Sequence, residues 1–249
     1  MTIIVADIHF GRLEQHAERE KEAALVACLR SLSAGMKRLI LLGDVFDYYI
    51  EYRHLIPRGY SRFMGLLAEL TDAGTELVYI VGNHDPWHLD YFSEEFGARV
   101  YSDEMIDEDN GARTYFHHGD GIARKSATYN RLRRILRHPI PVSLYRHVLP
   151  GDLGVRLARY VSRNYGDEGV DENVADDLRA EAQRLLDGGF GRVVMGHSHL
   201  PEVTSMRGGV YMNPGSWQEF RTVLRLSDDE GSLLTWNGRA CEAYQPATS

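Results

Sequence analysis

Short apolar segments alternate with amphipathic ones along the first eighty residues, and this alternation constrains the fold more than any other feature of the chain. Residues 2–6, 38–42 and 76–81 are compact, partly β-branched runs that end at Asp or Gly, as buried strands do. Residues 12–32 and 60–73 lie between these runs and have the pattern of helices. The order strand, helix, strand, helix, strand predicts a largely parallel sheet in an α/β protein.

The remainder of the chain adds further strands and a long helical region. Residues 113–117 form another candidate strand, and residues 126–187 are predicted to be mostly helical, with breaks at the prolines. Four late apolar runs indicate a second sheet: residues 192–195, 210–212, 221–225 and 232–236. The length of 249 residues favours one large domain, with a helical insertion at about residues 121–188.

Composition narrows the class of protein. The apolar content of 43% and the charged content of 26% are those of an ordinary globular protein. Two cysteines, Cys28 and Cys241, do not make a disulfide framework, so a reducing cytoplasm is expected. The first residues do not have the pattern of a signal peptide, and no run reaches the ~18 apolar residues of a membrane span.

The net charge of -8 conceals an uneven distribution. Residues 121–165 contain ten Arg or Lys residues and one acidic residue, Asp152. A basic block inside an acidic protein indicates an anionic ligand or an anionic surface at that block.

Five short polar motifs follow one another along the chain, each placed where an apolar run ends. The motifs are Asp7-Ile8-His9, Gly43-Asp44-Val45-Phe46-Asp47, Gly82-Asn83-His84-Asp85, His118-Gly119-Asp120 and Gly196-His197-Ser198-His199. In α/β proteins, ligand sites form outside the carboxyl ends of strands, so these side chains are expected to converge. They supply seven candidate metal ligands: Asp7, His9, Asp44, Asn83, His118, His197 and His199.

The types of ligand indicate the kind of metal site. Asp44 is the best candidate for a carboxylate that bridges two ions, and the mixed nitrogen and oxygen set suits Mn, Fe or Zn better than Ca or Mg. Each motif alone is more common as a turn or a surface feature, but five in series are hard to explain without a two-metal centre. Two adjacent ions activate a bridging water for attack on phosphorus, so the sequence predicts phosphoester hydrolysis.

With these five motifs the chain resembles the calcineurin-like metallophosphoesterase superfamily, over about four-fifths of its length. The resemblance implies a two-layer β-sandwich flanked by helices, and two divalent metal ions, for which Mn²⁺ is our first choice. It also implies two ligand sets that share Asp44. One metal is held by Asp7, His9, Asp44 and His199, and the other by Asp44, Asn83, His118 and His197.

The same resemblance assigns a catalytic role to His84. His84 is the residue expected to protonate or stabilise the leaving oxygen, and Asp47 is expected to orient it and keep it positively charged. The alternative is that His84 only positions the phosphate. Asp85 and Asp120 are expected to support the ligands or form turns.

The helical insert, the Gly82–Trp87 motif and a Gly-Ser-Trp sequence make the chain similar to the UDP-2,3-diacylglucosamine diphosphatase family of lipid A synthesis. That similarity implies a helical cap over the metals, lipid 1-phosphate and UMP as products, and a Gram-negative cytoplasm. The basic insert would contact the inner membrane peripherally. Tyr129, Arg159 and Arg163 are candidate substrate contacts. The chain differs from many members of that family in having His84, where they have Arg.

Other interpretations of the sequence remain open. The insert contains two apolar stripes among its arginines, one made of Leu153, Leu157, Tyr160 and Val161 and a second made of Leu132, Ile135 and Leu136. Such stripes suit a lipid with an anionic head group, but core packing with solvated arginines gives the same pattern. The substrate could instead be another nucleotide, a cyclic nucleotide or a phosphoprotein, and a metal-binding scaffold is a third class. Nucleic acid is not expected as a partner, because the chain is acidic and its basic block lacks a run of stacking aromatics. The sequence does not predict the oligomeric state.

Overall fold

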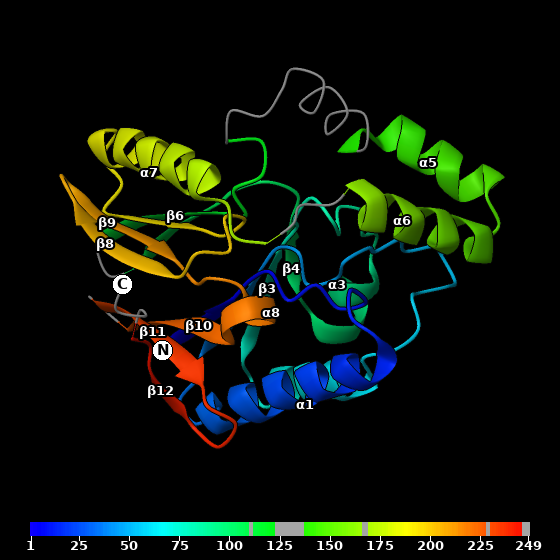
Figure 1. Ribbon diagram of the computed structural model, residues 1–249, viewed down its shortest axis with the longest axis horizontal. Coiled ribbons are helices and arrows are strands. Elements are labelled where there is room, and N and C mark those ends of the chain that lie inside the picture. Colours follow the sequence, from blue (N-terminus) through cyan, green and yellow to red (C-terminus); the bar gives the residue numbers. More distant parts are fainter. Residues whose placement is uncertain (110–111, 123–136, 166–168, 228–229, 246–249) are drawn as a thin grey trace.

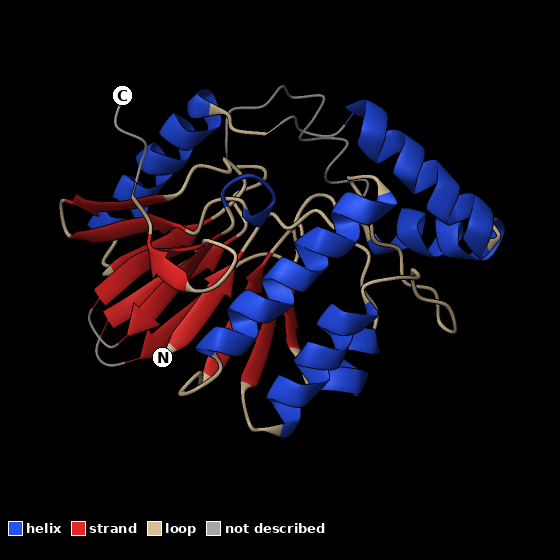
Figure 2. Ribbon diagram, turned by 60° about the horizontal axis from the view of Figure 1, so that its bottom comes forward, coloured by secondary structure: helices blue, strands red, loops and turns tan. Residues whose placement is uncertain are grey.

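Two β-sheets face each other and helices cover their outer surfaces, as the computed structural model shows (Figures 1 and 2). The structure describes residues 1–109, 112–122, 137–165, 169–227 and 230–245. Within these residues the first sheet has seven strands in the order β12-β11-β10-β1-β2-β3-β4, and the second has five in the order β5-β6-β7-β9-β8.

The first sheet combines a parallel half with an antiparallel half. The parallel strands are β1 (Thr2–Val5), β2 (Arg38–Leu42), β3 (Glu76–Ile80) and β4 (Arg99–Tyr101). The antiparallel strands are β10 (Thr222–Ser227), β11 (Glu230–Trp236) and β12 (Cys241–Ala243). The strands of the second sheet are β5 (Met105–Asp109), β6 (Ala112–His117), β7 (Arg192–Met195), β8 (Glu202–Met206) and β9 (Gly209–Asn213).

The prediction for the late strands was partly wrong. β7 and β9 do belong to the second sheet, but β10 and β11 join the first, where β10 pairs with β1 and places Arg225 opposite Ile3. The physical reason is that β10 buries Val223 and Leu224 on opposite faces, so it needs an interior position. A run of apolar residues indicates that a strand is buried, but it does not indicate with which strand it will pair.

Alternation along the strands builds the layers. Ile3 and Val5 of β1 pack toward the helices that cover the first sheet, whereas Ile4 packs between the two sheets with Val194 and Leu224. The covering helices are α1 (Gln15–Leu32), α2 (Ser61–Asp72) and the short α3 (Tyr91–Phe96). Because side chains alternate along a strand, a continuous apolar run fills both layers at once. The predicted sandwich flanked by helices is confirmed.

The helical region contains two kinds of helix. α7 (Glu172–Asp187) packs Leu178 and Leu186 against the second sheet, so it belongs to the sandwich. α5 (Pro139–Val148) and α6 (Gly151–Tyr165) lie apart from both sheets in Figure 1. Arg146 of α5 donates to the backbone oxygen of Trp87 at 2.9 Å, which attaches this pair to a motif loop.

The apolar stripe on α6 does not belong to a core. Leu153, Leu157 and Tyr160 are exposed, so core packing does not explain the stripe that they form on α6. The second stripe noted in the sequence, Leu132, Ile135 and Leu136, lies outside the described residues. No helix in the described part of the chain combines the length and apolar character needed to cross a membrane.

Candidate metal centre

The backbone is unusual at five of the seven predicted ligands. Asp7, His9, Asp44, His197 and His199 have φ values of 50°, 49°, 50°, 67° and 62°. Such left-handed conformations cost roughly 1–3 kcal/mol each for residues other than glycine and concentrate at functional sites. Neighbouring loops hold the backbone in place, since the backbone amide of His9 donates to the backbone oxygen of Asp44 at 2.9 Å. Each turn directs its side chain beyond the end of its strand.

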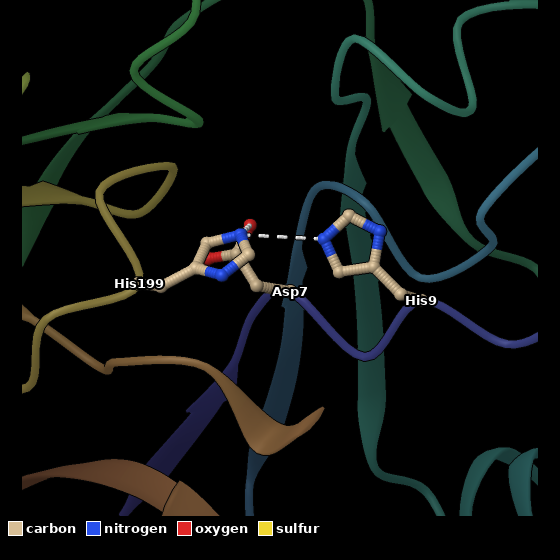
Figure 3. A group of neighbouring side chains, drawn as sticks. All are labelled: Asp7, His9 and His199. Atoms are coloured by element: carbon tan, nitrogen blue, oxygen red, sulfur yellow. Dashed lines mark hydrogen bonds and ion pairs between the residues drawn. The ribbon is translucent and has the colours of Figure 1, made fainter. Parts of the chain in front are cut away.

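The first group of ligand atoms comes from the loops after β1 and β7. The Nε2 atoms of His9 and His199 lie 3.3 Å apart, and His199 Nε2 lies 3.5 Å from Asp7 Oδ1 (Figure 3). Ligand atoms about 2.1 Å from one ion are separated by distances of this size. Asp7, His9 and His199 are therefore spaced to hold a metal ion.

A second group lies beside the first and contains Asp44, His118 and His197. His118 Nε2 is 3.3 Å from Asp44 Oδ2, and the same carboxylate oxygen is 3.9 Å from His9 Nε2. Asp44 consequently lies between the two groups, where one carboxylate can reach both.

Hydrogen bonds on the far side of two imidazoles fix their orientation. His199 Nδ1 donates to Glu219 Oε2 at 2.8 Å, and His118 Nδ1 donates to the Leu42 backbone oxygen at 2.9 Å. Each Nε2 atom is therefore turned toward the cluster.

Asp7 Oδ1 and Asn83 Oδ1 are buried ligand atoms that lack a hydrogen bond among the described residues. Buried acceptors are costly unless something satisfies them. Divalent cations provide the missing interaction, so the donor set fits metal ions.

The electrostatics of the cluster show how strongly its members interact. Burial raises the pKa of Asp7 to about 6, against the effect of nearby imidazoles. Burial alone would lower the pKa of His118, but the Asp44 carboxylate overrides it and raises that pKa to about 10. Burial also opposes ionisation of Asp44, yet His118 and His84 hold its pKa well below the usual value. Burial lowers the pKa of His9 to about 4, which leaves this imidazole neutral and able to bind metal.

Asp85 supports the loops rather than contributing a ligand. Its carboxylate accepts hydrogen bonds from the Val45 amide at 2.7 Å, the Gly82 amide at 2.8 Å and the Tyr79 hydroxyl. It thereby joins the loop after β2 to the loop after β3. A Cβ at Gly82 would overlap the Asp44 carboxylate, so the close approach of these loops requires glycine there.

His84 lies at the edge of the cluster, within reach of His9 and Asp44. Its Nδ1 atom is 3.0 Å from the Asp47 backbone oxygen and 3.9 Å from the Asp47 carboxylate. The Asp47 carboxylate also accepts from the Ser162 hydroxyl of α6 at 2.7 Å and lies 3.5 Å from His9 Nδ1. Asp47 therefore contacts His84, His9 and the insert at the same time.

Of the three predicted substrate contacts, the structure describes the side chain of Arg159 only. Arg159 donates from Nε to the Tyr48 hydroxyl at 2.8 Å and lines a cavity of about 560 Å³, together with Gly11 and Tyr60. Tyr129 lies outside the described residues, as does the side chain of Arg163.

Asp120 accepts a hydrogen bond at 2.7 Å from Arg137, which also donates to the Gly82 oxygen at 3.0 Å. Arg137, which lies just before α5, therefore attaches the insert to the motif loops.

Sequence reasoning missed Glu219 and Ser162. Glu219 lies in the short helix α8 (Trp217–Phe220), directly after the Gly-Ser-Trp sequence, and only that proximity could have drawn attention to it. Ser162 gave no signal, because a serine in an amphipathic helix is ordinarily a surface residue.

A two-layer α/β sandwich with carboxylates and imidazoles gathered at its strand ends defines a metal-dependent hydrolase. The chain belongs to the calcineurin-like phosphoesterase family, whose model matches residues 2–201. It is therefore a metal-dependent phosphoester hydrolase.

Relatives with curated names are similar along much of the chain. A UDP-2,3-diacylglucosamine hydrolase of Porphyromonas gingivalis is 36% identical over 146 residues, which cover 58% of this chain and 56% of the relative. Another with that name, from Pseudomonas syringae pv. tomato, is 28% identical over 241 residues and 94% of each chain. Among solved structures, vacuolar protein sorting 29 from Cryptosporidium parvum aligns with a TM-score of 0.49 at 12% identity, over 98% of this chain and 94% of that one.

Proposed function

We propose that the protein hydrolyses the pyrophosphate bond of UDP-2,3-diacylglucosamine and releases lipid 1-phosphate and UMP. One observation carries this proposal. The similarity to the Pseudomonas relative named for that substrate extends over 94% of both chains, so it includes the helical insert as well as the motifs. One fold can support reactions on many substrates, so we expect the insert, rather than the shared sandwich, to determine substrate specificity.

The proposed metal ligands follow the two clusters. Asp7, His9 and His199 would hold one ion, and His118, His197 and Asn83 the other, with Asp44 shared between them. When bound, the two ions, which we propose to be Mn²⁺, would supply an activated water and neutralise charge on the phosphoryl oxygens. The protein fixes the imidazoles for this task through Glu219 and the Leu42 oxygen.

His84 would transfer a proton to the leaving oxygen. Its Nδ1 atom donates to the Asp47 backbone oxygen, which leaves Nε2 available to the substrate. The Asp47 carboxylate lies 3.9 Å from Nδ1 on the same side of the ring, so Asp47 would help to orient His84. Ser162 holds the carboxylate from the insert, so this part of the catalytic site would be complete only when α6 lies in place.

The two outer helices would meet the lipid. Ile140, Leu144 and Val148 of α5 are 71%, 62% and 65% exposed, and their spacing of four residues places them on one face. The exposed residues Leu153 and Leu157 continue this apolar surface onto α6. Arginines on the same insert would attract anionic head groups. The enzyme would thus work in the cytoplasm, attached peripherally to the inner membrane of a Gram-negative bacterium.

The deciding experiment is hydrolysis of UDP-2,3-diacylglucosamine with Mn²⁺, measured beside UDP-glucosamine and bis-p-nitrophenyl phosphate. Asp44→Ala serves as the blank, because it removes the shared carboxylate. Release of UMP from the lipid substrate alone is the expected result. Turnover of the generic diester without any turnover of the lipid would retain the metal chemistry and exclude the proposed substrate.

The membrane contact is tested separately with the double variant Leu144→Ser/Val148→Ser. We expect that this variant no longer co-sediments with vesicles of phosphatidylglycerol but still hydrolyses bis-p-nitrophenyl phosphate. The matched control is Ile106→Ser, which changes an exposed apolar residue on β5, outside the insert. Equal sedimentation of both variants would exclude α5 as the membrane contact.

A further inference from the structure

Two cysteines that are far apart in the sequence meet at the edge of the first sheet. Cys28 lies on α1 and Cys241 begins β12, and their Sγ atoms are 3.0 Å apart. Figure 1 shows β12 beside the C-terminal part of α1. A covalent S–S bond requires about 2.05 Å, so closing it needs a movement of roughly 1 Å.

The two thiols differ in their surroundings. Cys28, on the inner face of α1, is fully buried in the core, whereas Cys241 is only partly buried at the sheet edge. The hydrogen bond with Cys28 lowers the pKa of Cys241 to about 7, and the same contact raises the pKa of Cys28. Because the thiolate is the reactive form of cysteine, an oxidant that arrives from solvent meets the reactive partner first.

The position of β12 gives a bond at this place a structural effect. β12 is the outermost strand of its sheet and has only three residues, which pair with β11. Short terminal strands open readily, since few interactions hold them. The opposite partner is firmly held, because α1 is an 18-residue helix whose inner face lies in the main core.

We propose that Cys28 and Cys241 form an oxidative modification site that closes to a disulfide and fastens β12 to α1. The oxidant is a peroxide. The Cys241 thiolate attacks one oxygen of hydrogen peroxide, the O–O bond breaks, and a sulfenic acid and one water result after protonation. The Cys28 sulfur then attacks the Cys241 sulfur, the S–O bond breaks, and the thiol proton leaves with the second water. Two thiols and one peroxide thus give one disulfide and two waters.

The test exposes the whole protein to hydrogen peroxide, blocks the remaining thiols under denaturing conditions and measures intact mass. We expect the wild type to lose two hydrogen atoms and both alkylatable thiols, with full reversal by dithiothreitol. Peptide mapping should join the peptide of Cys28 to that of Cys241. Two variants serve as controls. In Cys241→Ser, the buried Cys28 should stay reduced, and in Cys28→Ser, Cys241 should add oxygen because no resolving thiol remains.

Other results would overturn the site. These are addition of two oxygen atoms to Cys241 in the wild type while Cys28 stays alkylatable, a disulfide-linked dimer, or no reaction at either thiol. The fastening of β12 has its own readout. The oxidised wild type should melt several degrees above the reduced protein, and Cys241→Ser should show no such difference. A disulfide that leaves the melting temperature unchanged would remove the structural part of the proposal.

Discussion

His199 Nδ1 donates a hydrogen bond to Glu219 Oε2 at 2.8 Å, although His199 lies in the loop after β7 and Glu219 in the helix α8. Only Nε2 of that imidazole faces the metal cluster. The bond fixes the tautomer and the orientation of the ring, and the negative charge makes the imidazole a stronger ligand. We therefore expect metal binding to depend on Glu219, although this side chain would not contact the metal.

We predict that Glu219→Ala weakens the binding of Mn²⁺ by roughly 10–100-fold, the usual effect of losing such a partner. Glu219→Gln keeps an acceptor without the charge, so its affinity should fall between that of Ala and that of the wild type. Isothermal titration calorimetry on the chelator-treated protein measures both. The control is Glu95→Gln on the exposed side of α3, which should bind as the wild type does. Equal affinities in all variants would contradict the role of Glu219.

Metal binding should release protons. Without metal, the pKa of His118 is raised to about 10, so at about pH 8 this ligand carries a proton that a metal must displace. The affinity should therefore rise as the pH increases and flatten as the pH passes the pKa of His118. Below pH 6 the effect should be steeper, because Asp7 also becomes protonated. Calorimetry in two buffers of different ionisation enthalpy counts the protons, and a pH-independent affinity would refute this prediction.

His84→Gln should separate the two roles considered for this residue. If His84 supplies a proton, kcat should fall by roughly 100- to 10,000-fold with little change in KM. A role limited to binding phosphate would instead raise KM and leave kcat nearly intact. Metal content must be measured in parallel, since His84 lies within reach of the cluster. His16→Gln, which alters an exposed histidine on α1, is the matched control.

A glycine substitution should disable the site without altering any ligand. In Gly82→Ala the new Cβ would collide with the Asp44 carboxylate, so we expect loss of metal binding and of activity in a protein that is still folded. Gly65→Ala is the control, because a Cβ at this position in α2 meets no atom within 4 Å. It should stabilise the helix by about 0.5–1 kcal/mol with no effect on activity. Thermal melts and metal content distinguish the two variants.

The sequence by itself determined the elements that depend on local patterns. Strands at residues 38–42 and 192–195 were predicted with the bounds that they have, because compact apolar runs between turn residues leave few alternatives. The carboxyl ends of β1, β2 and β3 point the same way, since the strands are parallel. The motifs after them, with Asp7 and Asp44 among their residues, therefore had to meet at one edge of the sandwich.

Only the tertiary structure decided which distant partners come together. β10 and β11 pair within the first sheet, and Glu219 forms a hydrogen bond with His199. Ser162 donates to Asp47, and the thiols of Cys28 and Cys241 are in contact. None of these contacts follows from local spacing, because each depends on the packing of whole layers against one another. The periodicity of the sequence predicts which face of a helix or strand a residue occupies. Which residues of other elements it contacts on that face depends on the complete fold.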